Sequence, residues 1–171
     1  MTIHREHPFL DPDWARDAVR QFRGRLATGV TLWACGAGAT RVGLTVSSLL
    51  VAGGQPPRLI VLLDPLADLT DGLTRTGMTA VTLLRHGEQY LADVFAGLAP
   101  APGGRCGRAD FAQTPWGPVL AGDRTWAGLR LEDVREVGWS QLATCVLEHV
   151  EVADERDPLV HHRGGYPRIG G

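Results

Sequence analysis

The sequence of 171 residues contains no lysine, and all 17 of its basic residues are arginine. Schiff-base catalysis by lysine and the phosphate-binding P-loop both depend on a lysine amine, so neither is available to this chain. The chain also has no G-x-S-x-G, no H-E-x-x-H and no complete G-x-G-x-x-G. The sequence therefore lacks the common hydrolase, zinc-protease and dinucleotide-binding signatures.

Cysteine is scarce, and the three present, Cys35, Cys106 and Cys145, are far apart and form no C-x-x-C. Free thiols in a reducing cytoplasm are the simplest interpretation. The polar start, residues 1–7, lacks the apolar run of a signal peptide, and no run of 18 apolar residues exists to span a membrane. A net charge of −2 gives no basic face for nucleic acid or a lipid surface. We therefore expect a cytoplasmic protein without either partner.

The histidines offer no obvious metal site. His161 and His162 are adjacent, so on a strand their side chains point to opposite faces and cannot chelate together. His4 and His7 fall within residues 1–10, which we expect to be a flexible arm. No metal centre is predicted, because structural and catalytic zinc sites need ligands at closer and more regular spacings.

A hydrophobic content of 44% with 21% charged residues predicts one globular domain over residues 1–171. Asp11 and Pro12 suit the N-cap and first position of a helix that ends before Gly29. Apolar residues then recur at helical spacing, so we expect an amphipathic helix docked on the core. These residues are Trp14, Ala18, Phe22 and Leu26.

Short apolar runs rich in β-branched residues predict about six strands, mostly joined by hairpins, with helices over residues 66–76 and 88–95. The continuous run 59–63 is expected to be buried on both faces. The Gly-, Pro- and Arg-rich segment 97–117 is expected to form one long loop. The other runs are 30–35, 41–46, 78–84, 125–137, 140–152 and 159–162. Together they indicate a mainly β, antiparallel barrel with peripheral helices.

Thr45, Val46, Ser47 and Ser48 place three hydroxyls and several backbone N–H groups where a predicted strand ends. Such a segment can cradle a phosphate or the edge of a flavin without any cation. Serine and threonine also favour turns that cap themselves, and the local pattern alone favours that interpretation. The choice between the two depends on the rest of the chain.

Five segments, in order over about residues 18–169, resemble the flavin reductase-like, FMN-binding split-barrel family. Each matches one family motif: the opening helix with its "ATGV", the flavin loop, a Pro-Pro strand, a Phe-Ala-Gly and the closing Pro-Leu to Tyr stretch. The segments are Phe22–Thr31, Val42–Leu49, Gln55–Val61, Phe95–Gly97 and Asp157–Tyr166. The resemblance implies an α+β, mainly β fold, namely a six-stranded antiparallel split barrel of Greek-key type. It also implies a homodimer, often the reductase partner of a two-component flavin monooxygenase.

The resemblance further implies a site for FMN, with FAD and riboflavin as alternatives, and NADH or NADPH as electron donor. It places Thr45, Val46, Ser47 and Ser48 on the flavin. The turn of Asp64, Pro65, Leu66 and Ala67 would lie near the phosphate, with backbone N–H groups of Leu66 and Ala67 available to it. Phe95 and Ala96 would close the other side. The nicotinamide side would be formed by Trp139, His162 and Tyr166.

Two features depart from the family pattern. The turn after residue 63 lacks the basic or hydroxyl-rich residues usual there, and Asp68 would repel a phosphate. The family often carries Gly-Asp-His where this chain has Gly138-Trp139-Ser140, so that histidine is missing. The first hypothesis is an NAD(P)H-dependent flavin reductase that transfers hydride to the flavin. The alternatives are a non-catalytic flavin-binding or carrier protein, and a relative that shares only the fold.

Overall fold

The computed structural model describes residues 13–169, so the expected arm at 1–10 and the expected cap at Asp11 and Pro12 lie outside the described part. The main sheet has seven strands in the order β3-β2-β6-β9-β10-β5-β4. All neighbouring pairs are antiparallel. The strands are β2 (Thr31–Cys35), β3 (Val42–Val46), β4 (Leu49–Ala52), β5 (Arg58–Leu63), β6 (Met78–Leu83), β9 (Trp126–Val137) and β10 (Ser140–Glu151).

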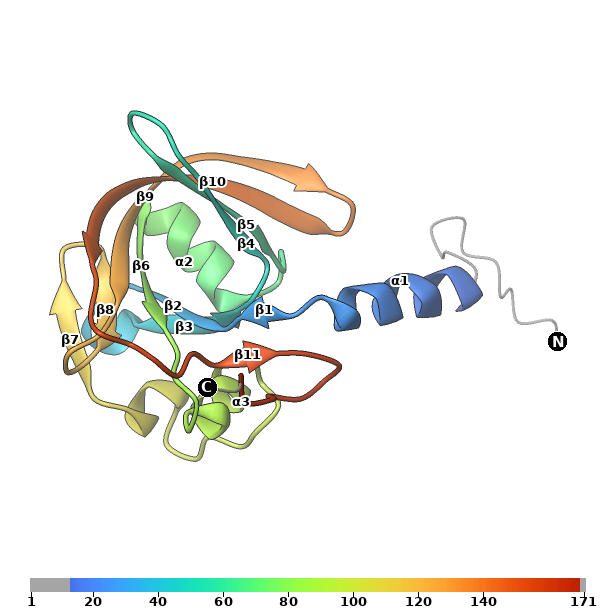
Figure 1. The fold of residues 1–171 in the computed structure, drawn as a ribbon. Helices are drawn as coiled ribbons and strands as arrows, with labels where there is room; N and C mark the ends of the chain where they lie inside the picture. Colours follow the sequence, from blue (N-terminus) through green and yellow to red (C-terminus); the bar gives the residue numbers. More distant parts are fainter. Residues whose placement is uncertain (1–12, 170–171) are drawn as a thin grey trace, which may run out of the picture.

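The sheet curls into a half-barrel whose two edge strands, β3 and β4, are joined only by Ser47 and Ser48 (Figure 1). The predicted mainly β split barrel is confirmed, with one more strand in the main sheet than predicted. The additional strand is β4, which was not predicted because it directly follows the predicted flavin loop. Two small sheets, β1 (Thr28–Gly29) with β11 (Val160–His161) and β7 (Phe111–Thr114) with β8 (Gly117–Leu120), complete the fold.

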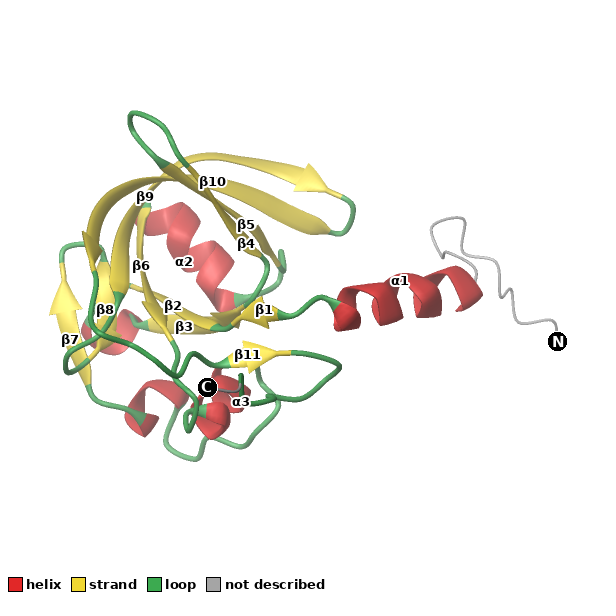
Figure 2. Cartoon of the chain, in the orientation of Figure 1, coloured by secondary structure: helices red, strands yellow, loops and turns green. Residues whose placement is uncertain are grey.

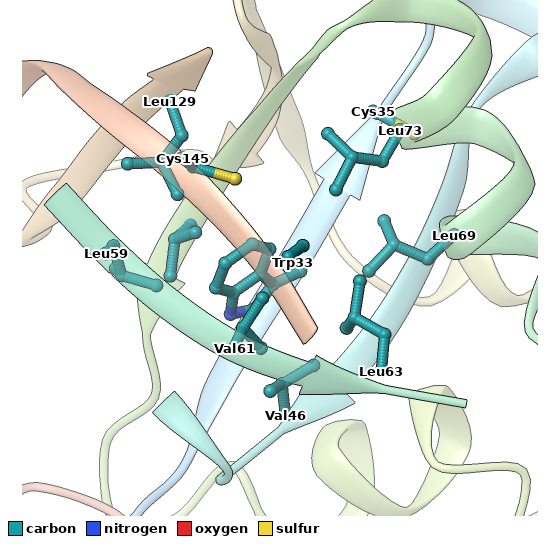
Figure 3. Packing of buried hydrophobic residues seen from close by; sticks show 12 residues of the cluster. Trp33, Cys35, Val46, Leu59, Val61, Leu63, Leu69, Leu73, Leu129 and Cys145 are labelled. Carbon is teal, nitrogen blue, oxygen red and sulfur yellow. The ribbon is translucent and has the colours of Figure 1, made fainter. Parts of the chain in front are cut away.

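The first hydrophobic core fills the inside of the curl around Trp33, which is completely buried. Helix α2 (Asp68–Thr76) lies within the curl and contributes Leu69 and Leu73 (Figures 2 and 3). Its Gly72 permits this approach, since an added Cβ would lie 2.5 Å from the Cys35 Sγ. One predicted peripheral helix is thus part of the core, because its apolar stripe seals an open barrel.

The second core lies on the other side of β2 and β3, beneath helix α3 (Gln89–Phe95). Phe95 sits directly over β3: a Cβ added at Gly43 would lie 2.8 Å from the Phe95 Cε1. The segment 97–117, predicted as one loop, holds the short helix η2 (Arg105–Arg108) and strand β7. Cys106 and Phe111 from this segment pack against the second core.

Helix α1 (Asp13–Arg25) projects away from the body (Figure 1). Phe22 is 68% and Leu26 is 49% exposed, so the predicted docking of this stripe on the chain's own core is wrong for the described residues. Apolar spacing specifies an amphipathic helix, but it does not identify the surface that covers it. Among residues 13–169, no helix is long and apolar enough to cross a membrane.

Strand β5 is buried on one face only, contrary to the prediction for residues 59–63. Leu59, Val61 and Leu63 are buried, whereas Leu62 is 40% exposed. In a curled antiparallel sheet one face meets the core and the other faces outward. An uninterrupted apolar run therefore leaves an apolar stripe on the outside of the barrel.

Candidate functional site

A cavity of about 310 Å³ opens where the ends of several strands meet, and we call it the strand-end pocket. Its size falls at the lower end of the roughly 300–1,000 Å³ typical of small-molecule sites. Most of its wall is apolar, with hydroxyl groups from three residues. It is lined by Thr28, Gly29, Val30, Thr31, Ser47, Leu49, Leu83, Leu84, Pro158 and Leu159.

Backbone hydrogen bonds join three of these lining segments. The Val30 N–H donates to the Leu159 carbonyl at 2.9 Å, and the Leu159 N–H donates to the Leu84 carbonyl at 2.8 Å. The Leu84 N–H donates in turn to the Val30 carbonyl at 3.1 Å. Segments that are far apart in the sequence are thereby fixed relative to one another, so the pocket is largely pre-formed.

The segment that leads to Pro158 is held by the half-buried Glu155. Its Oε1 accepts hydrogen bonds from the Arg85 side chain, with an Arg85 Nη2 distance of 3.1 Å, and from the Thr125 N–H at 3.0 Å. Burial raises the pKa of Glu155, but the hydrogen bonds from Thr125 and Arg85 outweigh it and hold the pKa below its usual value. Glu155 therefore stays ionised and anchors the C-terminal wall of the pocket.

Two residues of the segment Val42–Leu49 line this pocket, Ser47 and Leu49, and Ser47 is the one that belongs to the four residues predicted to contact the flavin. The Thr45 hydroxyl donates to the Ala92 carbonyl of α3 at 2.7 Å, and the Ser48 hydroxyl donates to the Leu62 carbonyl at 2.8 Å. The Val46 side chain is buried in the first core. The Thr45 and Ser48 hydroxyls are thus bound within the fold, and Ser47 is the one of these four residues that lines the cavity.

The predicted phosphate turn is closed on itself. The Leu66 N–H donates to the Asp64 Oδ1 at 2.8 Å, and the Ala67 N–H donates to the Asp64 carbonyl at 3.1 Å. These are the two N–H groups expected to reach the phosphate, and both are already used. Aspartate commonly satisfies a turn in this way. Pro65 and the Leu66 side chain are exposed without lining the pocket.

The remaining predicted site residues lie elsewhere. Phe95 is 1% exposed in the second core, and the Ala96 N–H closes α3 on the Ala92 carbonyl. Trp139 is 66% exposed at the β9–β10 turn. The His162 N–H pairs with the Gly165 carbonyl.

Tyr166 is tied to helix α3. Its hydroxyl donates to the Asp93 Oδ1 at 2.7 Å, and burial together with Asp93 raises its pKa. Like the residues above, it does not line the strand-end pocket.

The strand-end pocket also contains residues that sequence reasoning does not assign to the site. Thr28 to Thr31 and Pro158–Leu159 fall within segments that match family motifs, but those motifs carry no predicted role in flavin binding.

A second cavity, of about 330 Å³, lies at the start of β3, and we call it the arginine pocket. Arg41 and Arg105 line it together with one carboxylate, from Asp68. The Arg41 Nε is buried and has no hydrogen-bond partner among the described residues. No sequence motif indicated these two arginines. The complete lining is Arg41, Val42, Gly43, Asp68, Arg105 and Cys106.

Comparison with known proteins places the chain in a family. The model of the flavin reductase like domain matches residues 23–170. The reductase component of 4-hydroxyphenylacetate 3-monooxygenase from Thermus thermophilus is 26% identical over 159 residues, covering 90% of this chain and 97% of the relative. An FMN reductase (NADH), RutF 2 of Methylorubrum extorquens, is 30% identical over 150 residues and covers 84% of each chain.

Among solved structures, the NADH:FAD oxidoreductase SgcE6 of Streptomyces globisporus, in complex with NAD and FAD fragments, has the same fold. Its TM-score is 0.82 at 21% identity, with 94% of this chain and 96% of that chain covered. The family model spans the curled sheet and both pockets. The chain belongs to the flavin reductase like domain family.

Proposed function

We propose that this chain is an NAD(P)H-dependent flavin reductase that holds the flavin ring in the strand-end pocket. The observation that carries this proposal is the position of Ser47: this residue of the segment that matches the family's flavin loop lines a pre-formed, mostly apolar cavity. The relatives named for FMN reduction with NADH support the choice of flavin and donor. FAD and riboflavin are the alternative flavins, and NADPH is the alternative donor.

The pocket fits a flavin ring in shape and chemistry. Leu49 and Leu83, which are at least partly exposed, offer apolar surface to a flat aromatic system, and Ser47 adds a polar residue to the wall. A Cβ added at Gly29 would have no heavy atom within 4 Å, so there is open room beside this backbone. The Thr31 hydroxyl is less available, because it donates to the Val46 carbonyl at 2.6 Å.

The bound flavin would supply the redox chemistry, since its ring accepts a hydride from a reduced nicotinamide. The residues of this chain would bind and orient the two rings and exclude water, and no side-chain acid or base is required. We place the nicotinamide near the segment after Leu159, which carries His162 and Tyr166. Trp139 belongs to the same proposal as an exposed indole available for stacking.

The test is to titrate the purified chain with FMN, FAD and riboflavin, and then to follow oxidation of NADH and NADPH with each flavin present. Saturable binding with flavin-dependent NADH or NADPH oxidation is the expected result. Binding without turnover would instead establish the second candidate, a flavin carrier, which the absence of the family histidine at Gly138-Trp139-Ser140 favours. Absence of binding to all three flavins would refute both.

We further propose that the reduced flavin is passed to a monooxygenase component in the cytoplasm. The Thermus relative, itself the reductase component of a two-component monooxygenase, supports such a partner. Three free cysteines, Cys35, Cys106 and Cys145, suit a reducing compartment.

A homodimer is the assembly we propose, with the outer face of β4, β5 and β10 as its interface. Leu50 lies opposite Ile60, and Leu62 lies opposite Leu142, so four apolar residues adjoin on one face of the sheet. Leu50 is 74% exposed in the single chain. Contiguous apolar patches of this kind are typical of protein interfaces.

Combining Leu50→Glu with Leu62→Glu is expected to convert a dimer into a monomer, because four carboxylate side chains would be buried without partners at the interface. Sedimentation equilibrium would show the mass fall by about half at micromolar concentration. Leu98→Glu is the matched control, since Leu98 is exposed but lies outside this sheet face. If the double variant remains dimeric, the interface lies elsewhere on the chain and the proposed sheet face is wrong.

A further inference from the structure

The arginine pocket brings two guanidinium groups together with a single carboxylate. Arg41 precedes β3, Arg105 begins η2, and Asp68 begins α2. Neither arginine forms an ion pair within the part of the chain that the structure describes. The pocket therefore holds a surplus of one positive charge, the balance that an anionic group would neutralise.

The buried Arg41 Nε needs an acceptor. A buried N–H without a partner is costly, and native structures leave few of them. A guanidinium fork matches the geometry of phosphate oxygens, which accept several hydrogen bonds at once, and two arginines line this one cavity. The unpartnered donor and the surplus charge thus both favour a phosphate in this pocket.

The two cavities lie along the course of one edge strand. Ser47 lines the strand-end pocket and Gly43 lines the arginine pocket, and the four residues of rise between them correspond to roughly 13 Å at about 3.3 Å per residue. That span suits a flavin whose ribityl chain carries its phosphate away from the ring. The predicted phosphate turn offers no competing donors, because the N–H groups of Leu66 and Ala67 are bound to Asp64.

We propose that Arg41 and Arg105 bind the phosphate of the flavin, and that Asp68 weakens this binding. This inference rests on the proposed function, since it requires the flavin ring in the strand-end pocket. The arginines take over the role that the family gives to the turn after β5, so phosphorylated flavins would be preferred over riboflavin.

The test compares FMN with riboflavin, which lacks the phosphate, by fluorescence titration of dissociation constants. Arg41→Gln and Arg105→Gln are each expected to weaken FMN binding by roughly tenfold or more, as for loss of a charge-assisted hydrogen bond. Riboflavin affinity should change by less than about twofold, because the ring pocket is untouched. Asp68→Asn should tighten FMN binding and leave riboflavin binding unchanged.

Arg108→Gln is the matched control, because Arg108 lies on the same η2 segment but donates to the Pro102 carbonyl outside the pocket. It should alter neither flavin's affinity. Equal affinity of the wild-type chain for FMN and riboflavin would overturn the phosphate pocket while leaving the proposed function intact. Equal losses for both flavins in the arginine variants would also overturn it. Failure of the wild-type chain to bind any flavin would overturn both proposals.

Discussion

Gly29→Trp is expected to weaken flavin binding by at least about 100-fold while leaving the chain folded, because the indole would take up most of the space for the flavin ring. Gly29 lines the strand-end pocket, and a side chain built on it meets open space rather than other atoms. Because Gly29 belongs to the pocket wall, an indole at this position would compete with the flavin ring for the space beside that wall. Gly29 also lies in strand β1, where a large aromatic residue is well tolerated. Fluorescence titration measures the binding, and circular dichroism with thermal unfolding measures the fold.

Gly29→Ala is the control for this experiment, because it adds a single methyl group at the same backbone position. Its flavin affinity should stay within a few-fold of wild type, which separates the filling of the pocket from any effect on β1. If Gly29→Trp binds FMN as tightly as wild type, the ring lies outside the strand-end pocket, and the proposed site is wrong.

The parts of the fold that sequence predicts are those encoded locally. The run at residues 30–35 is β-branched or apolar and is bounded by Gly29 and Gly36, and the run at 41–46 follows a glycine-containing turn, so β2, β3 and their hairpin could be predicted from residue type and turn chemistry. The ordered family motifs then indicated the split barrel. Strand β4 was missed because the flavin loop and the strand share one apolar and hydroxyl-rich stretch.

The candidate site is harder to predict because the availability of each donor depends on contacts with residues far away in the sequence. The Thr45 hydroxyl is committed to Ala92, 47 residues away, and this removes it from a pocket that Ser47 still lines. Arg41 and Arg105 meet only after α3 folds over β3 and brings η2 beside it. The ordered family motifs therefore predict the loop, whereas the local pattern alone does not, and neither predicts which of its groups remain available.

Phe95 distinguishes the sequence-based site from the structural one. The family motif places Phe95 against the flavin, whereas the structure buries its ring, 1% exposed, between Gly43 of β3 and an edge-to-face contact with Phe111 at 6.2 Å. Phe95→Ala is accordingly expected to lower the free energy of unfolding by about 3–5 kcal/mol, the usual cost of an emptied aromatic core site. Denaturant titration with urea measures this change.

Phe95→Leu separates packing from ligand contact, because leucine refills much of the volume and keeps the chain folded for binding measurements. FMN affinity of this variant should remain within about twofold of wild type, since the ring lines neither pocket and leucine keeps apolar packing against Gly43, which does line the arginine pocket. A tenfold loss of FMN affinity with unchanged stability would instead indicate that Phe95 contacts the flavin, as the family motif predicts. Because α3 also holds Thr45 through the Ala92 carbonyl, only a variant that preserves this helix can decide between the two roles.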